Sequence, residues 1–273
     1  MGRMHRRAMA VAGMAALAAL VLGGCRPGTH TVVTALPPAH DVVFVVPHED
    51  DESIFAGELL EHYRSSGAHV KLIYGTLSVG GAVAAKLPDY GVARGRGLAE
   101  VLARFPGFEV TTAPIPDGGG MPTGRKTREF AEFLRRPGMV PRDAAVFVIG
   151  GTGNSDHVDC REDVLSLMAR RRQPVFLYWG YGQDHSRLDT DRYGQPVAFV
   201  PSETERASKR WASGVYDRGV YRDARFRRFR PRIMDTVGDD VVTAVWPRPP
   251  DPRPVAVSDS YRRTKLSSRS SSR

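Results

Sequence analysis

Short apolar runs alternate with longer amphipathic stretches along most of this chain, and the alternation predicts a sheet covered by helices. The expected strands are short and mostly rich in β-branched and aromatic residues; they are residues 42–46, 69–74, 109–115, 144–149 and 174–179. The expected helices place apolar side chains at helical spacing; they are residues 53–66, 92–105, 123–136, 159–172 and 202–216. We therefore expect an α/β, Rossmann-like three-layer fold with a largely parallel sheet of about five or more strands.

The first expected strand ends in a dense polar cluster. Residues 48–52 read His-Glu-Asp-Asp-Glu and follow Pro47 at the carboxyl end of the strand, where open α/β sheets bind ligands. His48, Asp50 and Asp51 offer one nitrogen and two hard oxygens, which suits zinc or another divalent metal. From spacing alone, a solvated acidic loop that caps the next helix is the alternative.

A second histidine-bearing loop follows the strand at 144–149. Residues 150–157 read Gly-Gly-Thr-Gly-Asn-Ser-Asp-His. His157 would complete three protein ligands and leave one position open for water, as catalytic metal sites require. The sequence thus predicts a metal site at the C-terminal ends of the strands.

Residues 47–52, Pro-His-Glu-Asp-Asp-Glu, resemble the AHPDDE signature of the PIG-L, or LmbE-like, family of zinc-dependent N-acetylglucosaminyl deacetylases. The resemblance implies that His48 and Asp51 bind Zn²⁺, or another divalent metal, and that Asp50 is the general base. Glu49 stands where the family usually has proline.

Residues 154–157, Asn-Ser-Asp-His, resemble the family's His-Pro-Asp-His segment, which implies that His157 is the third metal ligand. Asn154 occupies the catalytic position of a histidine that assists the tetrahedral intermediate in relatives. An asparagine can donate a hydrogen bond there but cannot act as a proton donor.

Two further residues are implied to bind substrate. Arg94 begins a segment similar to the family's Arg-x-x-Glu-Leu pattern, although Gly97 replaces the acid, and a plain surface arginine is the alternative. Asp117 lies in a Pro-Asp-Gly segment that resembles one in relatives, and an ordinary Asp-Gly turn is its alternative.

Two features lie towards the C-terminus of the expected domain. Lys209, Ala212 and Tyr216 resemble the family's late Lys-x-x-Ala-x-x-x-Tyr helix. Residues 218–232 then hold seven arginines with aromatic residues between them. Two interpretations of this stretch stay open: contact with anionic polymers or lipid headgroups, and a helix salt-bridged to acidic neighbours.

The N-terminus has the pattern of a bacterial lipoprotein signal peptide, residues 1–25. Three arginines precede an apolar run of about 15 residues, shorter than the roughly 20 that a spanning helix needs. Residues 22–25, Leu-Gly-Gly-Cys, resemble a lipobox, which implies lipidation of Cys25. We expect a secreted, extracytoplasmic protein anchored by lipid to the outer face of a bacterial cell membrane; an uncleaved membrane anchor is the alternative.

The rest of the chain divides into three segments: a proline-containing tether at 26–40, the deacetylase-like domain at 41–246 and a disordered, basic, Pro/Ser-rich tail at 247–273. The formal net charge is +9, but residues 1–26 and 247–273 carry the whole excess. Because the body between them is balanced, the charge does not indicate nucleic-acid binding.

The expected function is a metal-dependent hydrolase, a zinc-dependent amidohydrolase that acts on a linear amide. It would remove an N-acetyl or other acyl group from an N-acetylglucosamine-type amino sugar or glycoconjugate at the cell surface. Its expected partners are that substrate and the membrane, not nucleic acid. The alternative is a catalytically weak or inactive glycan-binding surface lipoprotein of the same fold. Three departures from the family's pattern favour it: Asn154, Gly97, and Arg218-Gly219 in place of the Ser-Gln of relatives.

Overall fold

The structure, a computed structural model, describes nine parts of the chain: residues 31–33, 36, 38–78, 87–117, 124–150, 155–173, 175–179, 197–230 and 240–245. The expected signal peptide with Cys25, Asn154 and the tail at 247–273 lie outside the described residues. Within these nine parts, no helix combines the length and the apolarity that crossing a bilayer requires.

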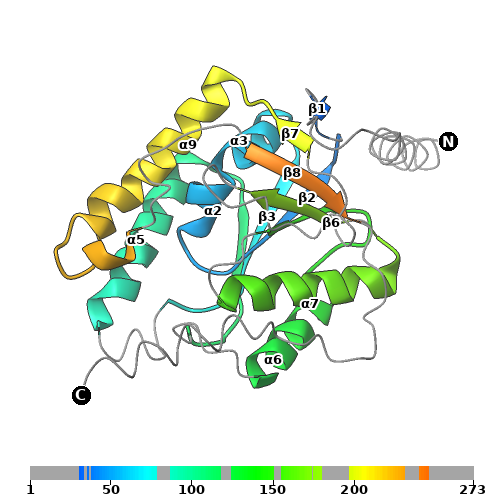
Figure 1. Ribbon diagram of the computed structural model, residues 1–273, viewed down its shortest axis with the longest axis horizontal. Helices are drawn as coiled ribbons and strands as arrows, with labels where there is room; N and C mark the ends of the chain where they lie inside the picture. The colour runs from blue at the N-terminus through cyan, green and yellow to red at the C-terminus, as the bar shows by residue number, and fades with distance from the viewer. Residues whose placement is uncertain are drawn as a thin grey trace, which may run out of the picture.

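The described strands form one eight-stranded, mixed sheet at the centre of the molecule (Figure 1). Their spatial order is β1-β7-β8-β6-β5-β2-β3-β4. The strands are β1 (Thr31–Val33), β2 (Asp41–Val46), β3 (His69–Tyr74), β4 (Glu109–Thr112), β5 (Ala145–Ile149), β6 (Val175–Trp179), β7 (Val197–Phe199) and β8 (Asp240–Val245). The five strands from β6 to β4 are all parallel, which confirms the expected largely parallel sheet, and β8 is antiparallel to both β6 and β7.

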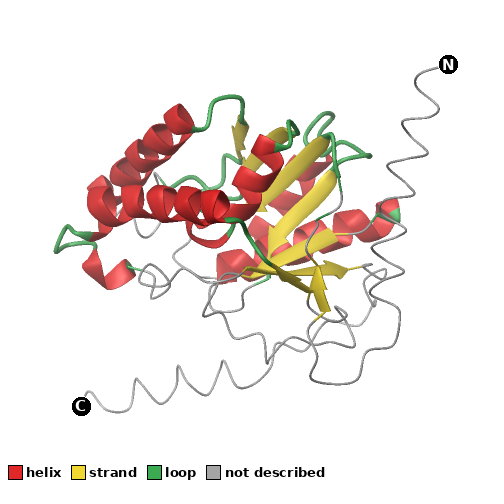
Figure 2. Cartoon of the chain, turned by 90° about the horizontal axis from the view of Figure 1, so that it is seen from above, coloured by secondary structure: helices red, strands yellow, loops and turns green. Residues whose placement is uncertain are grey.

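Helices cover both faces of this sheet, as the view from above shows (Figure 2). They are α2 (Asp51–Phe55), α3 (Gly57–Ser65), α5 (Pro88–Arg104), α6 (Gly124–Arg135), α7 (Ser155–Arg171) and α9 (Glu203–Tyr216), and two short turns follow, the π-helical η2 (Asp217–Tyr221) and the 3₁₀ η3 (Arg227–Phe229). Figure 1 places α6 and α7 on one side of the sheet, and α5 and α9 on the other. The expected three-layer arrangement is therefore present.

Strand β2 explains how two cores form around one sheet. Its residues 42–46 are all buried, because β2 lies between β3 and β5 and is covered on both faces. Val43 and Val45 pack into the core beneath α6 and α7, whereas Val42, Phe44 and Val46 pack into the core beneath α3. This alternation follows from the two-residue period of a strand. Since β2 is the middle one of the five parallel strands, its carboxyl end lies at the middle of their edge.

Two details differ from the sequence prediction. The helix expected at 53–66 is divided at Ala56 into α2 and α3. A Cβ atom at Gly57 would lie 3.0 Å from Lys209, so a glycine at the start of α3 lets α9 approach closely. The expected tether at 26–40 is wrong at Thr31–Val33, because these β-branched residues pair with Val197–Phe199 as an edge strand too short to show periodicity.

Candidate active site

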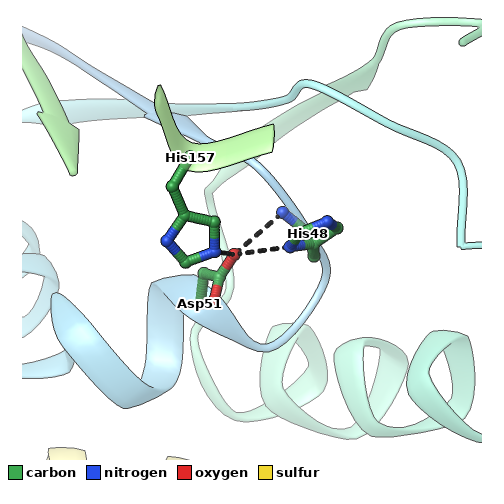
Figure 3. Close-up of side chains that lie close together, drawn as sticks. All are labelled: His48, Asp51 and His157. Carbon is green, nitrogen blue, oxygen red and sulfur yellow. Dashed lines mark hydrogen bonds and ion pairs between the residues drawn. The ribbon is translucent and has the colours of Figure 1, made fainter. Parts of the chain in front are cut away.

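His48, Asp51 and His157 lie together at the carboxyl edge of the sheet (Figure 3). One carboxylate oxygen of Asp51 is 3.1 Å from Nδ1 of His48 and 3.2 Å from Nε2 of His157. Parallel pairing of β2 with β5 brings the segments that follow these strands to the same edge, although the two histidines are far apart in sequence. All three side chains are buried.

These three residues form a donor set that fits a divalent metal. Two imidazole nitrogens and one carboxylate oxygen all lie within 4.8 Å of one another. Three protein ligands of these types are what catalytic zinc sites use, with the fourth position left for water or substrate. The alternative of a solvated acidic loop is wrong, because the segment from His48 to Glu52 is buried. The role of the three residues as ligands stays a prediction.

Two carboxylates hold the other side of the His48 ring. Nε2 of His48 lies 3.2 Å from Asp156 and 3.9 Å from Asp117. Such contacts fix the orientation of a metal-binding imidazole, and here they leave Nδ1 facing Asp51. Asp117 is buried and faces the site, and its contact with a substrate stays a prediction. We did not predict the role of Asp156, although it directly precedes His157.

Asp50 belongs to the same segment but has partners of its own. Arg94 donates to one of its carboxylate oxygens, and the hydroxyl of Tyr221 donates to the other. Arg94 also donates from Nε to the carbonyl of Glu49, at 3.0 Å. Since Arg94 is only 4% exposed, the surface alternative for this arginine is wrong. A substrate contact for Arg94 stays a prediction, but its observed role is to hold Asp50.

The backbone at Asp50 is unusual for a residue other than glycine. Its φ is 150°, in a region that residues with a Cβ rarely adopt. Strained conformations of this kind persist where the surroundings impose them, and they cluster at functional sites. Here Arg94 and Tyr221 hold the side chain, and Asp50 N–H donates to Glu52 at 2.9 Å.

Glu52 connects this segment to α9. It accepts hydrogen bonds from the hydroxyl of Tyr216, at 2.9 Å, and from that of Ser53, at 2.6 Å. A Cβ atom at Gly97 would lie 2.7 Å from the Tyr216 ring. The glycine that replaces the family's usual acid therefore makes room for Tyr216, and the departure from the pattern has a local steric cause.

The π-helical turn η2 places two tyrosines over the same acidic segment. Tyr216 ends α9 and Tyr221 ends η2, five residues later, and their hydroxyls reach Glu52 and Asp50 respectively. Residues five apart come to one face when a helix is widened to i→i+5 bonding, and π-turns are frequent at functional sites. No motif in the sequence indicated the role of Tyr221.

The pKa values of His48 and Asp51, two residues of the predicted ligand set, shift in opposite directions. Burial lowers the pKa of His48, but its hydrogen bonds to Asp156 and Asp51 outweigh burial and raise the pKa to about 10. Burial raises the pKa of Asp51, yet His157 and His48 outweigh it and hold the pKa well below its usual range. The cluster therefore favours positive charge beside the Asp51 carboxylate. A proton on the neighbouring imidazoles and a bound metal ion would compete to supply that charge.

The acids that contact the tyrosines are affected differently. Burial raises the pKa of Asp50, although the charge of Arg94 opposes the rise. Burial also raises the pKa of Glu52 to about 7, against the hydrogen bonds from Ser53 and Tyr216. Carboxylates whose pKa is raised in a buried site hold protons more readily than surface ones, which suits proton transfer.

Residues 43–168 match the family described as PIG-L, GlcNAc-PI de-N-acetylase. These residues belong to the PIG-L family. The PIG-L domain runs from β2 to α7 and includes both histidine-bearing segments. No curated protein sequence matches the chain.

Solved structures of low sequence identity share the fold of this PIG-L domain. A deacetylase triple mutant from the teicoplanin biosynthetic pathway is 15% identical, with a TM-score of 0.56, covering 75% of this chain and 98% of its own. The A40926 pseudoaglycone deacetylase is 16% identical, with a TM-score of 0.56 and coverages of 76% and 97%. A zinc-inhibited form of teicoplanin deacetylase is 14% identical, with a TM-score of 0.54 and coverages of 75% and 97%. Family and fold together support a deacetylase of the PIG-L kind.

Proposed function

We propose that this protein is a metal-dependent N-deacetylase that removes an acetyl or other acyl group from an N-acetylglucosamine-type amino sugar or glycoconjugate. One observation carries the proposal. A three-residue donor set of His48, Asp51 and His157 lies beside a separate buried carboxylate, Asp50, that Arg94 and Tyr221 hold in place. Metal-assisted hydrolysis of an amide needs both parts, ligands for a Lewis acid and a general base.

The residues present fit specific roles in that reaction. A bound Zn²⁺, or another divalent metal, held by His48, Asp51 and His157, would supply polarisation of the amide carbonyl and acidification of water. Asp50 accepts the proton that the attacking water loses. Arg94 and Tyr221 keep its carboxylate in one orientation, which lowers the cost of reaching a reactive geometry. The C–N bond then breaks as the nitrogen takes up the proton that Asp50 had accepted, and the carboxylic acid and free amine leave.

The names of relatives support the substrate class. The matching family is described by de-N-acetylation of a GlcNAc conjugate, and one similar structure is a deacetylase–teicoplanin complex. We extend this to an amino-sugar glycoconjugate for the present chain. The rival proposal, a catalytically weak or inactive glycan-binding protein of the same fold, draws support from Asn154, which stands where relatives have a histidine.

The decisive experiment measures free-amine release from a panel of N-acetylglucosamine conjugates in the presence of zinc. Asp50→Asn should keep metal and substrate affinity but lose activity by roughly 10²–10⁴-fold, since an amide cannot accept the proton. Asp143→Asn removes an exposed carboxylate and should leave amine release unchanged. If the parent binds metal and glycans but releases no amine from any conjugate, the hydrolase proposal fails and the binding proposal stands.

Asn154 allows a second arm of the same assay. Asn154→His introduces the imidazole that relatives have at this position, which can both donate a proton and stabilise an oxyanion. We expect the variant to match or exceed the parent in amine release. A large fall in activity would show that the asparagine has a role of its own.

We also propose that the protein is anchored to the outer face of a bacterial cell membrane through lipidated Cys25. The support is the sequence of residues 1–25: arginines, a short apolar run and a lipobox-like ending. Cys25→Ser should move the protein from the membrane fraction to the soluble fraction and abolish incorporation of a lipid label. An unlabelled parent whose membrane partitioning equals that of the variant would contradict the proposal.

A further inference from the structure

A cavity of about 530 Å³ lies at the end of η2 and is lined mainly by arginines. Its lining residues are Asp217, Tyr221, Arg222, Arg227 and Arg230. The volume falls within the range of small-molecule sites. Among the lining residues that the structure describes, three guanidinium groups face one carboxylate, and this excess of positive charge favours an anionic ligand.

Ion pairs within the protein account for part of the arginine-rich stretch. Arg218 lies 3.8 Å from Glu100, and Arg225 lies 2.8 Å from Asp89. Within the cavity, Nε of Arg230 donates to Asp217 at 2.7 Å. The interpretation of this stretch as salt-bridged is therefore correct for these three arginines.

Arg222 and Arg227 are different. Both are exposed at the cavity, and neither has a carboxylate partner among the residues that the structure describes. Asp217, the one acidic residue in the described part of the lining, already pairs with Arg230, so the charges of Arg222 and Arg227 are uncompensated within that part. A guanidinium is a planar fork of donors that matches phosphate oxygens bidentately.

The cavity adjoins the candidate active site through one side chain. Tyr221 lines the cavity, and its hydroxyl donates to the carboxylate of Asp50. Tyr221 is itself buried. The cavity and the residue proposed as general base thus share one side chain, Tyr221, as a neighbour.

We propose that Arg222 and Arg227 bind a phosphomonoester group carried by the amino-sugar substrate. The inference rests on the proposed function, because it assigns this group to the substrate of that site. A phosphomonoester carries nearly two negative charges at neutral pH, which matches the two uncompensated guanidinium groups, whereas a carboxylate or phosphodiester carries one. The substrate class is then a phosphorylated N-acetylamino sugar.

Calorimetric titration of the metal-loaded full chain tests this. The probes are N-acetylglucosamine 1-phosphate, inorganic phosphate and neutral N-acetylglucosamine. The double variant Arg222→Gln/Arg227→Gln should lose at least about tenfold in affinity for both phosphate probes, the loss expected from charge-assisted hydrogen bonds, and should bind the neutral sugar like the parent. Any phosphate contact with the metal is common to parent and variant, so the difference reports the arginines.

Arg218→Gln is the matched control, because it removes an exposed arginine of η2 that does not line the cavity. It should leave all three affinities unchanged. The inference is overturned if parent and double variant bind the phosphate probes equally, or if the double variant loses the neutral sugar to the same degree. These outcomes are independent of catalysis: a chain that releases no amine but loses phosphate affinity in the double variant keeps the phosphate site and loses the deacetylase proposal.

Discussion

The hydroxyl of Tyr221 donates a hydrogen bond to the carboxylate of Asp50, which lies 171 positions earlier in the chain. Arg94 holds the other oxygen of the same carboxylate from α5. Burial raises the pKa of Tyr221 well above its usual range, so its hydroxyl remains a neutral donor at physiological pH. The orientation of Asp50 is therefore set by the helical layer and not by its own loop alone.

Tyr221→Phe should lower kcat roughly 10- to 100-fold while changing KM little. The substitution removes one hydrogen bond to a charged group and keeps the ring that packs against Tyr90. Steady-state kinetics of amine release measure the two parameters separately. If KM rises and kcat is unchanged, Tyr221 contributes to substrate binding and does not position Asp50.

Much of the fold could be predicted because the central strands are buried on both faces. The apolar run of β3 was predicted at the observed bounds, His69–Tyr74, and β2 within one residue. The strands that the prediction missed, β1, β7 and β8, lie together at one end of the sheet. Two of them are only three residues long, too short for periodicity to reveal.

The site was predictable only where chemistry is local in sequence. The segment 48–52 and His157 are recognisable motifs, and parallel strand topology explains why they meet. Tyr221 is not part of any motif that we recognised, and its contact with Asp50 depends on a π-helical turn that no sequence pattern predicted. The steric reason for Gly97 likewise depends on a tyrosine from a distant helix.

His157→Ala should reduce metal content from close to one zinc or similar ion per chain to a small fraction of that. Two protein ligands rarely retain a divalent metal when three are needed. His40→Ala provides the control, because the His40 side chain is 88% exposed. Elemental analysis of the purified full chains measures the ratio. Equal metal content in the His157 variant and the parent would remove His157 from the site.

Lys209→Met should destabilise the protein by roughly 3–5 kcal/mol, the cost of leaving a buried charge without its partner. Nζ of Lys209 lies 2.7 Å from Glu58, and both side chains are buried where α9 meets α3. Arg210→Met breaks an exposed pair with Glu203 and should change stability by less than about 1 kcal/mol. Urea unfolding followed by circular dichroism compares the variants. If both variants lost a similar free energy of unfolding, the buried ion pair of Lys209 would contribute no more to stability than the exposed pair of Arg210.

Asp163 should make the protein less stable as pH rises. Burial, together with the charges of Asp159 and Glu162, raises the pKa of Asp163 to about 8, although the charge of Arg135 from α6 opposes the rise. Asp163 lines a small cavity together with the buried Cys160. One carboxylate oxygen of Asp163 has no hydrogen-bond partner, so its charged form is poorly accommodated.

Because the folded state binds this proton more tightly than the unfolded state, the contribution of Asp163 to the free energy of unfolding should be highest below the unfolded pKa of about 3.9 and should fall until the pH passes about 8. Asp163→Asn should remove this contribution and stabilise the protein at pH 9 relative to the parent, by roughly 5 kcal/mol at most, with little difference near pH 4. Glu132→Gln, which removes an exposed carboxylate of α6, should leave the pH dependence of unfolding as it is in the parent. Urea unfolding at several pH values measures all three chains. Parallel curves for the parent and Asp163→Asn between pH 4 and pH 9 would show that Asp163 ionises equally in both states.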